Sequence, residues 1–118
     1  MASFAKKLLS WSTDGKAIKV VATATAGTLI HTGPTVTSTL QEIWLWAQNN
    51  HTADVVLTLE WGDAVTDNNI IKTITFKSGE QMIIPGFIIK WNATPLTIKA
   101  FAATANVIMI QWFINEIA

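Results

Sequence analysis

The amino-acid sequence predicts an all-β protein, an antiparallel β-sandwich or jelly roll of about eight strands, with a short N-terminal arm. Three observations support this fold class. Apolar and polar residues alternate with a period of two in nearly every segment after residue 16. Turn-forming residues separate these segments at regular intervals of about eight to twelve residues. Ile and Thr, which are β-branched and suit a pleated sheet, are abundant.

The chain divides into an arm and one domain. The arm covers residues 1–16, and within it only residues 2–11 have helix-like spacing, with Phe4, Leu8 and Trp11 on one side. A segment this short forms either a marginal helix or a free arm. Residues 17–118 are long enough to bury a core without disulfide or metal support, and we expect them to form a single β-sandwich domain.

Eight segments of the domain have the composition and length of β-strands. In residues 54–61, for example, Val55, Leu57, Leu59 and Trp61 share one face, as in a half-buried strand. Gly, Asn, Asp and Pro lie between the segments, and Pro85-Gly86 predicts a bend within one of them. The expected strands cover residues 17–25, 28–32, 40–48, 54–61, 69–77, 80–90, 95–103 and 107–117.

Two of these strands are apolar on both faces. In the first, Ile43, Leu45 and Ala47 alternate with Trp44 and Trp46. In residues 107–117, the set of Ile108, Ile110, Trp112 and Ile114 opposes the set of Val107, Met109 and Phe113. A two-sheet sandwich covers only one face of each sheet, so the other face needs a second cover. Either a neighbouring subunit or the N-terminal arm folded back over the sheet could supply it.

We favour the neighbouring subunit, because charged residues make up only 14% of the chain, against about 25% in an average domain. Trp61 is expected in the core. The predicted interface residues are Trp44, Trp46, Ile110, Trp112 and Phe113.

The composition argues against several classes of partner. The formal net charge is zero and there is no arginine, which argues against binding to nucleic acid. No apolar run approaches the roughly 20 residues that span a bilayer, and the N-terminus lacks the apolar core of a signal peptide. We therefore expect a soluble protein made in a cytoplasm, with no membrane partner.

The ionisable residues do not form a recognisable reactive site. His51 and Asp54 could contribute to a metal site, but both fall in an Asn-rich turn where solvation is the simpler interpretation. Glu60 and Asp63 resemble a glycosidase acid pair only superficially, since they bracket a turn. His31 is expected to be a hydrogen-bonded sheet residue. The sequence therefore predicts a non-enzymatic protein without catalytic residues, metal or cofactor.

Residues 40–118 resemble a class of small structural proteins of tailed bacteriophages, which includes head decoration (cement) proteins and related β-sandwich virion modules. The segments that carry the resemblance are IWLWAQNNHT, ADVVLTLEWG, SGEQMIIPGFII and LTIKAFAATANVIMIQWFINEI. The resemblance implies a capsid decoration protein located in the virion, after synthesis in the host cytoplasm. It also implies a homo-oligomer, with a trimer favoured, that binds the major capsid protein or another virion protein.

A second interpretation is a carbohydrate- or receptor-binding β-sandwich module associated with a phage tail or fibre. Six tryptophans could supply aromatic faces for stacking on sugar rings. The two interpretations differ in where the tryptophans lie. A decoration protein buries them at subunit contacts, whereas a sugar-binding module exposes them along a strand face or at a loop.

Overall fold

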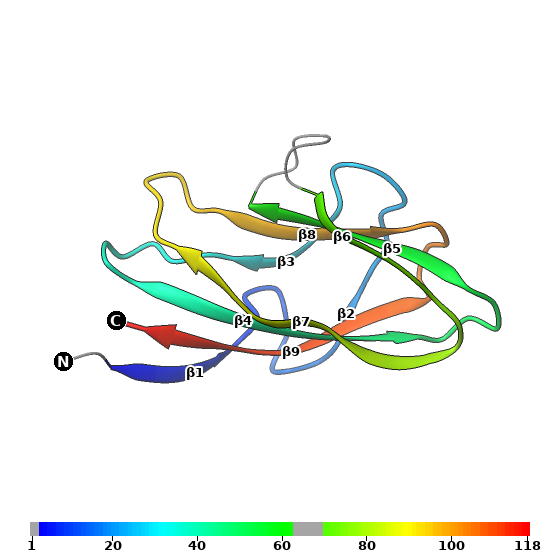
Figure 1. Cartoon of the computed structure of the whole chain (residues 1–118), viewed down its shortest axis with the longest axis horizontal. Helices are drawn as coiled ribbons and strands as arrows, with labels where there is room; N and C mark the ends of the chain where they lie inside the picture. Colours follow the sequence, from blue (N-terminus) through cyan, green and yellow to red (C-terminus); the bar gives the residue numbers. More distant parts are fainter. Residues whose placement is uncertain (1–2, 63–69) are drawn as a thin grey trace.

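The computed structural model describes residues 3–62 and 70–118, which form two antiparallel β-sheets packed face to face (Figure 1). Sheet A has the strand order β1-β9-β4-β7, and the short strand β2 also pairs with β9. Sheet B has the order β3-β8-β5-β6. The predicted β-sandwich is confirmed. The strands are β1 (Phe4–Leu8), β2 (Ile18–Lys19), β3 (Thr28–Thr32), β4 (Leu40–Asn49), β5 (Val55–Gly62), β6 (Ile70–Phe76), β7 (Gly79–Lys90), β8 (Thr97–Ala102) and β9 (Ile108–Ile117).

The strands pair as a series of nested hairpins. The innermost pair is β5 with β6, followed outward by β4 with β7 and by β3 with β8. In the outermost pair, β1 and β2 share a single edge position against β9. One long hairpin folded over into two sheets is the connectivity of a jelly roll. The structure therefore selects the jelly roll from the two sandwich forms that the sequence allowed.

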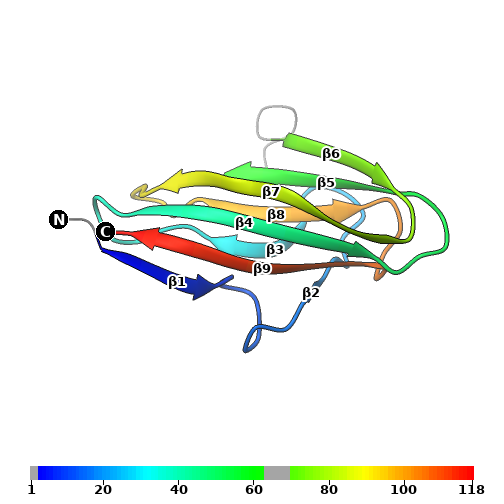
Figure 2. The same ribbon diagram turned by 60° about the horizontal axis from the view of Figure 1, so that its bottom comes forward.

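The N-terminal segment forms a strand of sheet A, and the described residues contain no helix. β1 pairs with β9 from Phe4 opposite Ile117 to Leu8 opposite Phe113. The pairing continues in two backbone hydrogen bonds between Ser3 and Ala118, of 2.8 and 2.9 Å. The helical alternative for this segment is therefore wrong for the described residues 3–11. The segment extends the edge of the sheet, and it does not fold back over the outer face of β4 and β9 (Figure 2).

The strand expected at residues 17–25 is shorter than predicted and ends at Lys19. After β2 the chain leaves sheet A and crosses to β3 in sheet B. The Thr28 hydroxyl accepts hydrogen bonds from the backbone N–H groups of Val21 and Ala22, both at 3.1 Å. A side chain thus replaces a neighbouring strand as the partner of these groups. The alternating pattern of the sequence contains no sign of this crossing.

The core lies between the inner faces of the two sheets and follows the period of two. Sheet A contributes Ile43, Leu45 and Ala47 of β4, and sheet B contributes Leu57 and Leu59 of β5, all fully buried. These are the faces that the alternation in both segments predicted. Trp61, at the end of β5, packs against this core as expected.

A chain of polar contacts, buried at His31 and Gln41 and exposed at Lys7, joins the two sheets to β1. Ser10 donates its backbone N–H to His31 Nδ1 at 3.0 Å, and His31 Nε2 lies 2.6 Å from Gln41 Oε1. Gln41 Nε2 donates to Glu116 Oε1 at 3.1 Å, and Lys7 Nζ pairs with Glu116 Oε2 at 2.6 Å. Because Gln41 uses its amide N–H on Glu116, its oxygen must accept from His31 Nε2–H. The neutral imidazole is therefore the form that fits, with Nδ1 as the acceptor.

This network predicts a loss of stability in mild acid. Burial lowers the pKa of His31 below its usual value of 6.5, against the opposing effects of the Gln41 hydrogen bond and the Glu116 charge. The unfolded chain then binds a proton that the folded chain resists, so the free energy of unfolding falls as the pH drops below about 6.5. The hydrogen bonds from Lys7 and Gln41 lower the pKa of Glu116, so this carboxylate adds a further loss near and below its usual value of 4.5.

We expect urea unfolding to show a decrease in stability between about pH 7 and pH 5, and the variant His31→Gln to have a clearly shallower slope. His51→Gln is the matched control, since it changes the other histidine, outside this network. A His31→Gln variant with the wild-type slope would contradict the assignment.

Candidate binding surface on the outer face of sheet A

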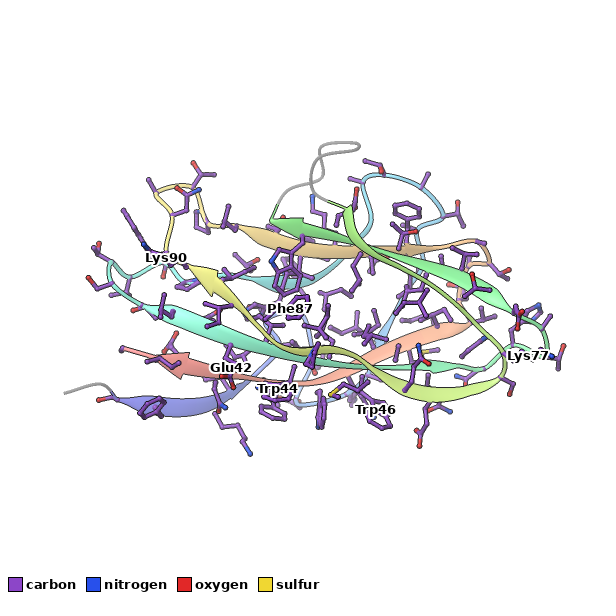
Figure 3. All side chains as sticks on the ribbon, viewed as in Figure 1. Glu42, Trp44, Trp46, Lys77, Phe87 and Lys90 are labelled. Atoms are coloured by element: carbon purple, nitrogen blue, oxygen red, sulfur yellow. The ribbon has the colours of Figure 1, made fainter. Side chains whose placement is uncertain are left out.

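The outer face of sheet A carries two apolar rows of side chains, separated by a polar row of Lys6, Asn115 and Glu42. Residues directly opposite one another in antiparallel strands lie on the same face. Trp44 lies opposite Phe113, and Phe113 in turn lies opposite Leu8. Leu40 is likewise opposite Ile117. In Figure 3, Trp44 and Trp46 project from β4 on the side away from sheet B.

Four aromatic residues form a single cluster on this face, made of Trp44, Trp46, Trp112 and Phe113. Trp44 is stacked on Phe113 with ring centroids 6.0 Å apart. Trp112 contacts the other three rings edge to face, at 6.0 Å from Trp44, 5.5 Å from Trp46 and 5.3 Å from Phe113. The cluster joins the two strands that the sequence predicted to be apolar on both faces.

Trp112 reaches the outer face through an unusual backbone conformation. Its partner across the sheet is Leu45, which is fully buried, so regular alternation would place Trp112 in the core with Ile110 and Ile114. Its φ is 135°, and its side chain is instead 39% exposed. The prediction that Trp112 shares a face with Ile110 is therefore wrong. A non-glycine residue at positive φ is strained, and such strain is concentrated at functional sites.

A bend in β7 makes room for the Trp44 ring. The pairing of β4 with β7 shifts between Ile43 and Trp44, so that Gly86 lies between the partners Pro85 and Phe87. Gly86 has φ 81°, and a Cβ at this position would lie 2.9 Å from Trp44 Cζ2. The Pro85-Gly86 pair, where the sequence predicted a bend, therefore leaves the space that the Trp44 ring occupies.

Polar groups hold the edges of the indole rings. Trp44 Nε1 donates to Glu42 Oε1 at 2.7 Å, and Asn115 Nδ2 donates to the same oxygen at 3.2 Å. Trp46 Nε1 donates to Glu80 Oε2 at 3.3 Å. Trp44 and Trp46 thus have hydrogen-bonded N–H groups, while their apolar ring surfaces remain on the outer face, an arrangement common at interfaces.

The outer face has two halves that differ in chemistry. The half that includes β1 and the end of β9 is mainly apolar, although Lys6, Asn115 and Glu42 form a polar row across it, and we call it the apolar half. The ammonium of Lys6 lies over the Phe113 ring there, 4.7 Å from its centroid. Opposite positions across the strands connect the apolar members Phe4, Leu8, Leu40, Trp44, Phe113 and Ile117. Exposed Ile88 extends this half at the β7 edge, where it lies opposite Glu42.

The other half contains a mixed polar and aromatic hollow of about 320 Å³. Three neighbouring strands line it: β4 with Trp46, β9 with Gln111 and Trp112, and β7 with Glu80. Glu80 and Gln111 are exposed to solvent, and Trp46 is half-buried.

The structure brings together four of the five residues predicted at an interface. Trp44, Trp46, Trp112 and Phe113 form the aromatic cluster, whereas Ile110 is fully buried in the core and is not on this surface. Sequence reasoning missed Glu80 and Gln111, which line the hollow. Strand alternation carries a signal for Gln111, because it falls on the same face as Met109 and Phe113. Only the register of β7 against β4 brings Glu80 near.

The structure places the ionisable residues that the sequence offered as candidate reactive groups at separate positions, with Glu60 in β5 and with His51 and Asp54 between β4 and β5. Glu60 is buried and accepts a hydrogen bond from the Gly27 backbone N–H at 2.6 Å. Its sequence neighbour Asp63 lies outside the described residues. The backbone N–H of His51 donates to Asn49 Oδ1 at 2.8 Å, and Asp54 is exposed. Within residues 3–62 and 70–118, no three His, Asp or Glu side chains gather as metal ligands.

In the part of the chain that the structure describes, no helix is long and apolar enough to cross a membrane. Comparisons with protein-family models, curated proteins and solved structures found no match to this chain. The surface therefore has to be interpreted from its own residues.

The strain at Trp112 can be tested with two variants that both remove the ring. We expect Trp112→Gly to be more stable than Trp112→Ala by about 1 kcal/mol, because only glycine adopts a φ of 135° without a steric penalty. Elsewhere in a strand, glycine is the less stable of the two. Chemical denaturation of both variants gives the difference, and an alanine variant at least as stable as the glycine variant would contradict the strained conformation.

The seat of Trp44 can be tested at Gly86. We expect Gly86→Ala to lower the free energy of unfolding by about 1–3 kcal/mol, since the new methyl group meets the indole ring at a strained φ. Gly15→Ala is the control, because Gly15 has a similar φ of 89° but its nearest neighbour would lie at an ordinary 3.6 Å. A loss no larger at Gly86 than at Gly15 would show that the ring does not depend on this contact.

Proposed function

We propose that this protein is a non-enzymatic structural protein of a bacteriophage virion, a capsid decoration or cement protein. It forms a homo-oligomer through the apolar half of sheet A and binds the major capsid protein or another virion protein. The observation that carries the proposal is the unpartnered apolar half. Phe4, Leu8 and Ile88 are 72%, 52% and 54% exposed in the single chain.

The energetics favour a second cover over this face. Covering a large apolar side chain stabilises an assembly by about 1.5–3 kcal/mol, reduced by the entropy of association. Soluble monomers rarely leave such a patch in water. The arm cannot be the cover, because β1 is itself an edge strand of the same sheet and adds Phe4 and Leu8 to the patch.

The jelly roll and the resemblance to decoration proteins support the virion assignment. Jelly rolls are common among viral capsid domains and lectins. The trimer rests on the resemblance, and the virion shell is the lattice that such trimers bind. Trp44 and Phe113 lie at the centre of the proposed contact. Trp112 packs against Trp44, and Trp46 packs against Trp112, from the adjoining hollow.

We expect the protein to have about three times the 12.9 kDa mass of one chain in size-exclusion chromatography with light scattering. Ile88→Ser and Phe4→Ser should raise the dissociation constant about tenfold or more, because each removes an apolar side chain from the contact. Both positions are exposed in the single chain, so the variants should keep the wild-type thermal stability of the isolated domain.

Val56→Ser is the matched control, since Val56 is 37% exposed and lies on the outer face of sheet B. It should leave the oligomer intact. A wild-type chain that stays monomeric at high micromolar concentration would overturn the proposal. An oligomer that Ile88→Ser and Phe4→Ser do not weaken would place the contact on another surface.

A further inference from the structure

We propose that the hollow between Trp46, Glu80, Gln111 and Trp112 is a binding site for a neutral hexopyranose, a sugar ring of a glycan. This site differs from the subunit contact in residues and in chemistry. The contact uses the apolar half, whereas the hollow combines two indoles with a carboxylate and an amide.

The size of the hollow suits a small ring. Ligand pockets range from about 300 to 1,000 Å³, and this hollow, at about 320 Å³, is at the lower end. It is open to solvent through the exposed side chains of Glu80 and Gln111. One sugar ring can enter from such a side while the rest of a glycan remains in water.

The tryptophans supply an apolar wall. Their ring centroids are 5.5 Å apart at an interplanar angle of 69°, so the two indoles are in direct contact. A hexopyranose has one face of C–H groups, which packs on the electron-rich face of an indole. The strained backbone of Trp112 places its ring in the hollow, whereas regular alternation would have buried the ring in the core.

The polar residues match hydroxyl groups. The Glu80 carboxylate is fixed by the Trp46 N–H at Oε2, and its lone pairs can still accept from sugar hydroxyls. The Gln111 amide offers a donor and an acceptor on the other side of the hollow. A pair of neighbouring hydroxyls can therefore donate to Glu80, while another bonds the amide.

The charge of the site selects neutral sugars. Among the residues that the structure describes, Glu80 is the only ionisable side chain that lines the hollow, so an acidic sugar or a phosphate would meet a negative charge without a cation there. A quaternary ammonium ligand fits less well, because it needs aromatic rings around it on several sides. The two rings here touch each other edge to face and surround a ligand on two sides at most.

Titration with methyl glycosides of glucose, galactose, mannose and N-acetylglucosamine tests the proposal. We expect at least one of them to shift the indole N–H signals of Trp46 and Trp112 in NMR spectra, with a dissociation constant on the order of 1 mM. Glycerol, which has hydroxyls but no apolar ring face, sialic acid and choline should not shift these signals at the same concentrations. A stronger response to choline would make this an ammonium site and overturn the proposal.

Glu80→Gln should weaken sugar binding about tenfold, because it replaces charge-assisted hydrogen bonds with neutral ones. Glu42→Gln is the matched control, since Glu42 also accepts from an indole N–H, that of Trp44, but does not line the hollow. It should bind sugar as the wild type does. The proposal fails if no glycoside shifts the two signals at about 50 mM, or if both variants weaken binding equally.

The outcome is independent of the oligomeric state. Ile88→Ser, which weakens the proposed subunit contact, should leave the indole shifts unchanged, because Ile88 does not line the hollow. A monomeric protein that binds the glycoside would overturn the proposed assembly function alone. A trimer that binds no glycoside would overturn the sugar site alone.

Discussion

The structure depends on the pairing of β4 along both of its edges. Every residue from Leu40 to Asn49 has a partner in β7 and a partner in β9. A strand held on two sides cannot slip by one residue without turning its whole side-chain set to the wrong face. The register therefore decides at once that Ile43, Leu45 and Ala47 make the core and that Trp44 and Trp46 make the outer surface. The core and the candidate binding surface are two sides of one strand.

Much of this could be predicted from the sequence, because the period of two is a local property. The alternation in residues 54–61 and 43–48 identified the buried faces of β5 and β4, and the structure confirms both. The same pattern marked the two strands that carry the aromatic cluster, since both have apolar residues on both faces, but it placed Trp112 on the face opposite Phe113. The sandwich architecture needed no more than these patterns and their spacing.

The parts that could not be predicted depend on contacts far apart in the chain. β1 has weak alternation and becomes a strand only because β9, more than a hundred residues later, offers it an edge. Trp112 breaks its alternation through a backbone angle, to which the sequence gives no local clue. The hollow needs Glu80 beside Trp46, and that contact depends on two register shifts between β4 and β7.

The nested order of the hairpins also controls when the outer face of sheet A comes into existence. Its aromatic cluster joins β4 to β9, the last strand in the chain, and β1 has nowhere to pair until β9 is in place. Contacts of such long sequence separation form late and slowly in folding, since chain entropy must be lost first. During synthesis on the ribosome, the surface that we propose as a subunit contact is thus completed only when the rest of the jelly roll can fold. A nascent chain that lacks β9 therefore does not present the complete outer face of sheet A to other nascent chains on the same polysome.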